Sequence, residues 1–180
     1  MLFALIRSDI AAKARWVYGD ASRRSVLKTV CTDGTGAMIL YRLMQWAHRR
    51  RLAPLAMLFN KLNGVVNRCI IGRGADFGPE FVLVHCLGVV INSAVTGGRH
   101  VVLEHQVTIG AEKGQHPALG DDVFVGAGAK ILGGVRIGSR VKIGANAVVL
   151  EDVPDDCTAV GVPARVVQGG RGRETVDLRP

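Results

Sequence analysis

The feature that most constrains the fold is a strict six-residue repeat between Leu119 and Pro154. The first position of each hexad is Leu, Ile or Val, and the fifth is small or β-branched. The first positions are Leu119, Val125, Ile131, Ile137, Ile143 and Val149, and the fifth positions are Val123, Ala129, Val135, Val141, Ala147 and Val153. An α-helix needs apolar residues about every 3.6 positions and a strand every second position, so this period fits neither alone. It is typical of a solenoid built from short strands and turns, in which each coil stacks on the previous one.

The repeat extends upstream, where two insertions interrupt it. Its earlier core positions are Ile71, Phe77, Leu83, Ile91, Gly97, Leu103 and Ile109, of which glycine offers the core no side chain. Two extra residues enter between Leu83 and Ile91, and four enter between Ile109 and Leu119. Because the repeat resumes after each insertion, the extra residues should bulge outward as loops, where a rigid scaffold usually carries its functional groups. Each interruption contains a histidine, His85 in the first and His116 in the second.

Helical patterns precede the repeat. We expect helices over residues 2–18, 23–30 and 37–50, and a fourth from Pro54 to about Leu62 that Asn63-Gly64 ends. A turn is expected at residues 32–36. The sequence therefore predicts an N-terminal helical region (1–66), a β-helix domain (67–167) and a polar tail (168–180).

Composition narrows the range of partners. The chain has 23 Lys and Arg against 15 Asp and Glu, a net charge of +8, and the excess lies mostly in the first third. A solvated helical face, an anionic membrane surface and an anionic substrate all fit this excess. Nucleic acid does not, because the basic stretch lacks interleaved aromatics and a recognition motif. The sequence shows no signal-peptide layout, no membrane-span-length apolar run and no metal spacing among its four cysteines, so we expect a cytoplasmic protein with reduced thiols.

The two histidines at the insertions are the candidate catalytic groups. His85 has apolar neighbours on both sides, and partial burial would keep its imidazole neutral and able to accept a proton. A packed structural histidine is the alternative, and for His116 the alternative is an exposed loop histidine. His100 and His105 lie within hexads and should face solvent or a neighbouring subunit. No metal site is predicted, because no His-x-His or His-x-x-x-His pair is present.

The chain resembles the hexapeptide-repeat acyltransferases, and within them the serine acetyltransferase type. The matching stretches are residues 88–95, 107–110, 116–117, 125–154 and 159–167, with weaker matches at 19–25 and 39–51. The resemblance implies a mainly β fold, a left-handed parallel β-helix with a short N-terminal α-helical region. It also implies acetyl-CoA as the donor and a homotrimer with active sites between subunits. The shortened helical region favours a trimer over a hexamer.

The resemblance also implies roles for individual residues. His85 matches the general base that deprotonates the acceptor hydroxyl, and His116 matches a second active-site histidine near the acceptor. The residues matched to the cofactor site are Gly110, Ala111, Ala127, Lys142, Ala145 and Arg165, of which Lys142 and Arg165 are the candidate phosphate partners. The residues matched to the acceptor site are Asp20 and Gln115.

The chain departs from the family around the acceptor. The family has Asp directly before the catalytic histidine, where this chain has Val84, and its orienting Asp falls at Ile70. The Arg before the second histidine is Gln115 here. Three acidic residues could replace the orienting Asp, namely Asp76, Glu80 and Glu104.

These departures shape the predicted function. A zwitterionic amino acid needs charged partners, so we predict O-acetyl transfer to a sugar hydroxyl in exopolysaccharide or capsule biosynthesis. A lipid-linked sugar at the inner membrane surface would suit the basic N-terminal region. Serine O-acetyltransferase activity and a non-catalytic β-helix scaffold are the alternatives.

Overall fold

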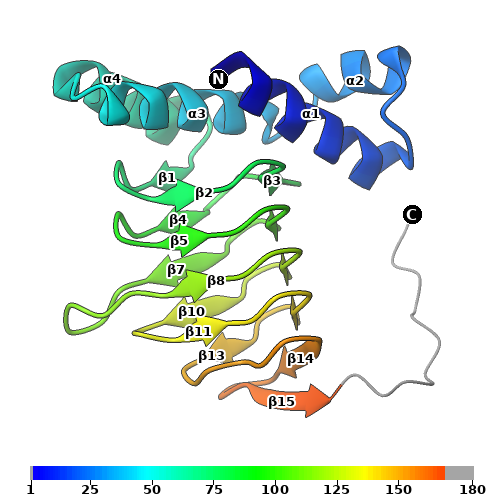
Figure 1. Ribbon diagram of the computed structural model, residues 1–180, viewed down its shortest axis with the longest axis vertical. Coiled ribbons are helices and arrows are strands. Elements are labelled where there is room, and N and C mark those ends of the chain that lie inside the picture. The colour runs from blue at the N-terminus through cyan, green and yellow to red at the C-terminus, as the bar shows by residue number, and fades with distance from the viewer. Residues whose placement is uncertain (1, 169–180) are drawn as a thin grey trace.

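A layer of helices covers one end of a triangular solenoid in the computed structural model, which describes residues 2–168 (Figure 1). The helices are α1 (Leu2–Tyr18), α2 (Arg23–Val30), α3 (Thr35–Arg49) and α4 (Ala53–Val66). None of these helices has the length and apolar character needed to cross a bilayer. The solenoid follows directly, beginning at β1 (Ile70–Ile71).

The predicted helices are present, with two differences. The first is that α3 begins at Thr35, inside the turn expected at residues 32–36. The fourth helix was expected to end at Asn63-Gly64, but α4 continues to Val66. Asn63 is buried, and its Nδ2 donates to the carbonyl oxygen of Ala37 at 3.2 Å, so it binds α4 to α3. Tertiary packing therefore extends the helix through residues that would otherwise end it.

Three parallel sheets form the walls of the solenoid. The first contains β1, β4 (Val90–Ile91), β7 (Thr108–Gly110), β10 (Lys130–Leu132) and β13 (Val148–Val149). The second contains β2 (Asp76–Phe77), β5 (Thr96–Gly97), β8 (Ala118–Leu119) and β11 (Arg136–Ile137). The third contains β3 (Val82–Leu83), β6 (Val102–Leu103), β9 (Phe124–Val125), β12 (Lys142–Ile143), β14 (Cys157–Val160) and β15 (Arg165–Gln168), the last antiparallel to β14.

The strand register confirms the repeat. Ile71 pairs with Ile91, Ile91 with Ile109, Ile109 with Ile131, and Ile131 with Val149. All of these side chains are buried, so the first position of each hexad fills the core. The two insertions are absorbed by the loops after β3 and β7, and the register resumes after each.

Gly97 keeps the period for a steric reason. A Cβ atom at this position would lie 2.3 Å from the ring of Phe77 on the coil above. The phenyl ring of Phe77 therefore fills the space that a side chain at position 97 would take. Glycine is therefore required at this core position, because the ring of Phe77 leaves no room for a side chain.

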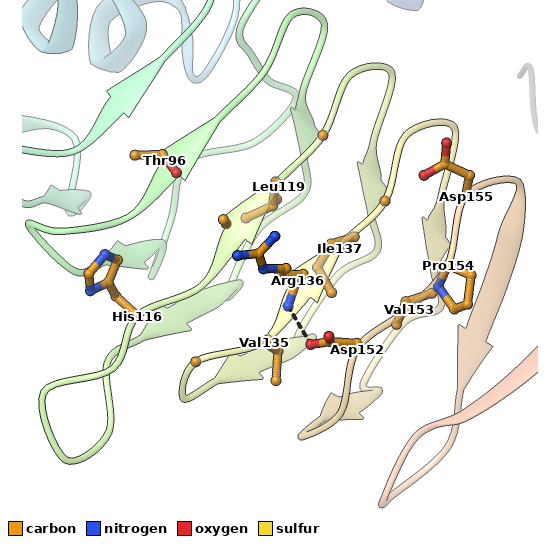
Figure 2. A pocket seen from close by; sticks show the side chains of 14 residues that line it. Thr96, His116, Leu119, Val135, Arg136, Ile137, Asp152, Val153, Pro154 and Asp155 are labelled. Atoms are coloured by element: carbon orange, nitrogen blue, oxygen red, sulfur yellow. Dashed lines mark hydrogen bonds between the residues drawn. The ribbon is translucent and has the colours of Figure 1, made fainter.

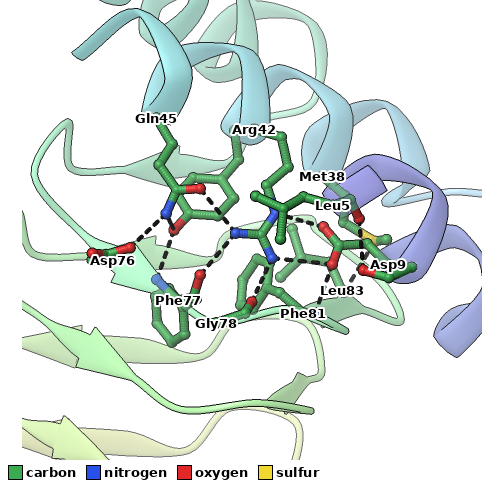
Figure 3. Close-up of polar contacts among 12 residues, drawn as sticks. Leu5, Asp9, Met38, Arg42, Gln45, Asp76, Phe77, Gly78, Phe81 and Leu83 are labelled. Atoms are coloured by element: carbon green, nitrogen blue, oxygen red, sulfur yellow. Dashed lines mark hydrogen bonds and ion pairs between the residues drawn. The ribbon is translucent and has the colours of Figure 1, made fainter. Parts of the chain in front are cut away.

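A buried ion pair joins the helices to the first coil (Figure 3). Arg42 on α3 contacts Asp9 on α1 through Nε at 2.6 Å and Nη2 at 3.0 Å. The same guanidinium donates to the carbonyl oxygens of Phe77 and Gly78, while Asp9 accepts from the backbone N–H of Phe81. This network fixes both helices against the solenoid.

Further along α1, Trp16 stacks on Phe124 of the third sheet with ring centroids 5.3 Å apart. The helix thereby lies against the outer face of this sheet, close to the loop that contains His85. The predicted tail, residues 168–180, lies outside the described residues except for Gln168, which ends β15.

Candidate active site

The corner between the third and first sheets carries His85. The turns after β3, β6, β9 and β12 stack along this corner and place His85, His105, Ala127 and Ala145 on successive coils. Backbone hydrogen bonds connect the turns, from Gly128 N–H to the carbonyl of His105 at 2.9 Å and from Asn146 N–H to that of Ala127 at 2.8 Å. The His85 and His105 rings lie edge to face, with centroids 6.1 Å apart. His105 therefore lies beside His85, and its side chain is 44% exposed, so it still faces solvent in the single chain as expected.

A carboxylate from the helical layer holds His85. Asp33 lies in the turn between α2 and α3, and its Oδ2 is 3.1 Å from Nδ1 of His85. Asp33 Oδ1 accepts from the Cys86 thiol at 3.3 Å. Asp33 is thus the orienting acid, and none of the three candidates named from the sequence takes this role. Asp76 binds Arg49 and Glu80 binds Arg15 and Arg99, away from His85.

The electrostatics of this pair select one tautomer of the imidazole. Burial would raise the pKa of Asp33, but hydrogen bonds from Cys86, His85 and the backbone of Gly34 outweigh it and leave the pKa below its ordinary value. Burial raises the pKa of the Cys86 thiol to about 11, so the thiol remains a donor. An ionised carboxylate only accepts hydrogen bonds, so Nδ1 of His85 carries the proton. The free Nε2 then has the lone pair that a general base needs.

The environment of His85 differs from the sequence expectation in one respect. Its side chain is 57% exposed in the single chain, so the expected partial burial by apolar neighbours is wrong. The neighbouring Leu87 is also exposed, whereas Cys86 between them is buried in the core.

His85 opens onto a cavity of about 390 Å³ between α1 and the third sheet. Its lining residues are Lys13, Trp16, Val17, Thr32, Asp33, Val84, His85, Glu104 and Phe124. Lys13 is buried and donates from Nζ to the main-chain oxygen of Asp33. Burial lowers the pKa of Lys13 to about 8, and the charges of Asp33, Cys86 and Glu104 limit the shift.

Sequence analysis missed both Lys13 and Asp33. The sequence did contain a sign of Lys13. It follows Asp9 by four residues, so two charged side chains lie on the apolar face of α1. A charge on such a face needs a buried partner. Asp33 gave no comparable signal, because it was part of an ordinary turn sequence.

His116 lies at a different corner, between the first and second sheets. The loop of residues 111–117 carries it, and reciprocal backbone hydrogen bonds of 2.9 Å between Glu112 and Gln115 close that loop. His116 lines a second cavity of about 750 Å³ over the second sheet. Figure 2 shows His116 at one end of this cavity and Asp155 at the other. A single chain therefore does not bring His85 and His116 together.

Five of the other predicted site residues lie at one or the other of these corners. Ala127 and Ala145 share the corner of His85, whereas Gly110, Ala111 and Gln115 belong to the His116 loop or its start. Asp20, Lys142 and Arg165 line neither cavity. Asp20 instead accepts a hydrogen bond from the backbone N–H of Ser22 at 2.7 Å, and Lys142 is exposed on the outer face of the third sheet.

Metal ligands are not gathered at either cavity. Within residues 2–168, no three His, Cys, Asp or Glu side chains are placed to hold a metal ion together.

A triangular parallel solenoid built on a six-residue repeat is the fold of the hexapeptide-repeat transferases. The family model for bacterial transferase hexapeptide (six repeats) matches residues 116–151. Serine acetyltransferase of Synechococcus elongatus is 38% identical over 151 residues, covering 82% of this chain and 62% of the relative. Serine acetyltransferase of Helicobacter pylori (strain 26695) is 38% identical over 171 residues, covering 93% and 94%.

Solved structures agree with these relatives. A serine acetyltransferase in complex with CoA matches with a TM-score of 0.83 and 32% identity, covering 92% of this chain and 69% of that one. Serine acetyltransferase from Vibrio cholerae matches with a TM-score of 0.85 and 30% identity, covering 95% and 67%. The chain therefore belongs to the serine acetyltransferase family of hexapeptide-repeat transferases.

Family membership confirms several predictions and overturns one. The left-handed parallel β-helix with its N-terminal helices is confirmed, as are an acyltransferase and acetyl-CoA as its co-substrate. The prediction of a sugar acceptor in exopolysaccharide or capsule biosynthesis is wrong, because relatives 35–38% identical over most of the chain are serine acetyltransferases. The departures at Val84, Ile70 and Gln115 indicated lost charge, but the cavity obtains charge from Lys13, Asp33 and Glu104 instead. The correction also removes the reason to expect a lipid-linked sugar at a membrane.

Proposed function

We propose that this chain transfers the acetyl group of acetyl-CoA to the hydroxyl of L-serine, giving O-acetylserine and CoA. The observation that carries the proposal is the His85–Asp33 pair, 3.1 Å apart at the mouth of a charged cavity. The serine acetyltransferases to which the chain is similar support the choice of acceptor. Both substrates are cytoplasmic metabolites, so we place the reaction in the cytoplasm.

The proposed mechanism uses His85 as general base. Its Nε2 takes the hydroxyl proton as the serine oxygen attacks the thioester carbonyl, and Asp33 stabilises the imidazolium that forms. The tetrahedral intermediate collapses, the C–S bond breaks, and the CoA thiolate takes the proton back from His85. No acyl-enzyme is required, because the two substrates react with each other directly.

We place the donor along the corner below His85. Ala127 and Ala145 follow His85 on later coils, and each presents only a methyl group. An extended pantetheine arm can therefore lie against the backbone there. Lys142 and Arg165, lower on the third sheet, remain the proposed partners of the cofactor phosphates. Gly110 and Ala111 start the His116 loop, so they would contact the thioester end from a neighbouring subunit.

The complete site requires a second chain. His116 lies at another corner of the triangle, so we propose that a homotrimer brings it beside His85 of the neighbouring subunit. In that position it would help to stabilise the oxyanion. Gln115 would reach the acceptor by the same route.

The test is release of CoA thiol from acetyl-CoA and L-serine by the purified protein. His85→Ala should lower kcat by about 10²- to 10⁴-fold, the usual contribution of general base catalysis. His48→Ala is the matched control, because His48 is an exposed histidine at the end of α3, and it should retain full activity. Full activity in His85→Ala would overturn the mechanism. No turnover by the wild-type protein would overturn the proposed function and favour the scaffold.

A further inference from the structure

The cavity beside His85 holds more charge than acetyl transfer to an uncharged alcohol requires. Two carboxylates, those of Asp33 and Glu104, and the ammonium of Lys13 line it together with apolar side chains. A charge in such surroundings is costly unless it is paired. The partner of each charged group in the chain therefore indicates whether that group is available to bind a ligand.

Two of the three charges have partners within the chain. Asp33 uses one carboxylate oxygen for His85 and the other for Cys86. Lys13 donates to the main-chain oxygen of Asp33 and is only 1% exposed. Both groups therefore have close partners in the chain that connect them to His85.

Glu104 is the charge without a close partner. Within the described part of the chain its carboxylate accepts no hydrogen bond, and its ion pair with His105 Nδ1 spans 3.7 Å. Its side chain is 21% exposed, so it is partly desolvated but still accessible from the cavity. Glu104 lies on the coil below His85. The residue before Glu104, Leu103, accepts a hydrogen bond at 3.0 Å from the backbone N–H of Val84, the residue before His85.

We propose that Glu104 determines acceptor specificity by binding the ammonium group of the amino-acid acceptor. The inference rests on the proposed function, and it names a residue that recognises the substrate. The ammonium and hydroxyl groups of serine sit on adjacent carbons. An ammonium held by Glu104 therefore directs the hydroxyl toward His85, one coil away. The excess of carboxylates over cations in the cavity also attracts a cationic group.

Three acceptors separate this role from a structural one. L-Serine carries both charged groups, ethanolamine lacks the carboxylate, and 3-hydroxypropanoate lacks the ammonium. In Glu104→Gln, kcat/KM should fall about 10- to 100-fold for L-serine and ethanolamine, because a charge-assisted hydrogen bond is lost. The value for 3-hydroxypropanoate and the KM for acetyl-CoA should change less than about twofold. If an acceptor is acetylated too slowly to measure kcat/KM, its inhibition constant (Ki) against L-serine can be compared between the variant and the wild-type protein instead.

Two further variants complete the experiment. Glu151→Gln removes an exposed carboxylate that lines neither cavity, and it should behave as the wild-type protein. Glu104→Asp keeps the charge and should lie between wild type and Glu104→Gln. Equal losses for L-serine and 3-hydroxypropanoate, or no loss for either, would overturn the role of Glu104 and leave the proposed function intact. A wild-type protein that does not acetylate L-serine would overturn both.

Discussion

At the scale of single residues, the pairing of Asp33 with His85 has a consequence that can be measured. In Asp33→Asn the side chain can no longer hold the Nδ1–H tautomer as a charged acceptor, nor can it stabilise the imidazolium. We expect kcat to fall about 10- to 100-fold, a loss of roughly 1.4–2.7 kcal/mol in transition-state stabilisation, with little change in the KM for acetyl-CoA. Steady-state kinetics with L-serine would show this split, whereas a general loss of structure would affect both constants.

Asp156→Asn is the control for that variant. Asp156 is also a carboxylate whose pKa is held below its ordinary value, by a hydrogen bond from Arg140, but it lies at another corner and outside both cavities. Its replacement should leave kcat unchanged. An unchanged kcat in Asp33→Asn as well would mean that His85 needs no orienting acid.

The same residues show what could be predicted from the sequence. His85 was identified because it interrupts a repeat, and the repeat is a local pattern that core packing enforces. Asp33 is 52 residues away from His85 in the chain, and only the placement of the helices on the solenoid brings the two together. That placement depends on buried contacts between segments with no common period, so no spacing rule reveals it. The wrong prediction of a sugar acceptor has the same cause, because the charged side chains near His85 come largely from the helical layer and could not be placed from the sequence.

At the scale of secondary-structure elements, the buried Asp9–Arg42 pair decides whether the helices keep their place (Figure 3). In Arg42→Met the carboxylate of Asp9 and the carbonyls of Phe77 and Gly78 lose their buried donor. Removing one partner of such a pair typically costs about 3–5 kcal/mol. Urea unfolding should show this loss.

The double variant Asp9→Leu/Arg42→Met tests the reason for that loss. Because it removes both charges, it should recover part of the stability, although the two carbonyls still lack Arg42 and the backbone N–H of Phe81 now lacks Asp9. A double variant no more stable than Arg42→Met alone would assign the loss to packing instead. α1 also carries Lys13 and Trp16, which line the cavity beside His85. Arg42→Met should therefore lower the activity even at urea concentrations too low to unfold the protein.

At the scale of the whole molecule, the separation of the two histidines predicts a shared active site. Each chain offers His85 at one corner and His116 at another. In the homotrimer that we propose, these unlike corners of neighbouring chains would meet. His85→Ala and His116→Ala should each be nearly inactive alone. After unfolding and refolding together in equal amounts, a site is intact where a chain with His85 meets a neighbour with His116. With random mixing, the probability that a chain retains His85 is one half, and so is the probability that its neighbour retains His116. We therefore expect about a quarter of the wild-type activity. Light scattering should report the mass of three chains for each variant and for the mixture. A mixture that stays inactive although it forms trimers would show that His85 and His116 do not act in one intersubunit site.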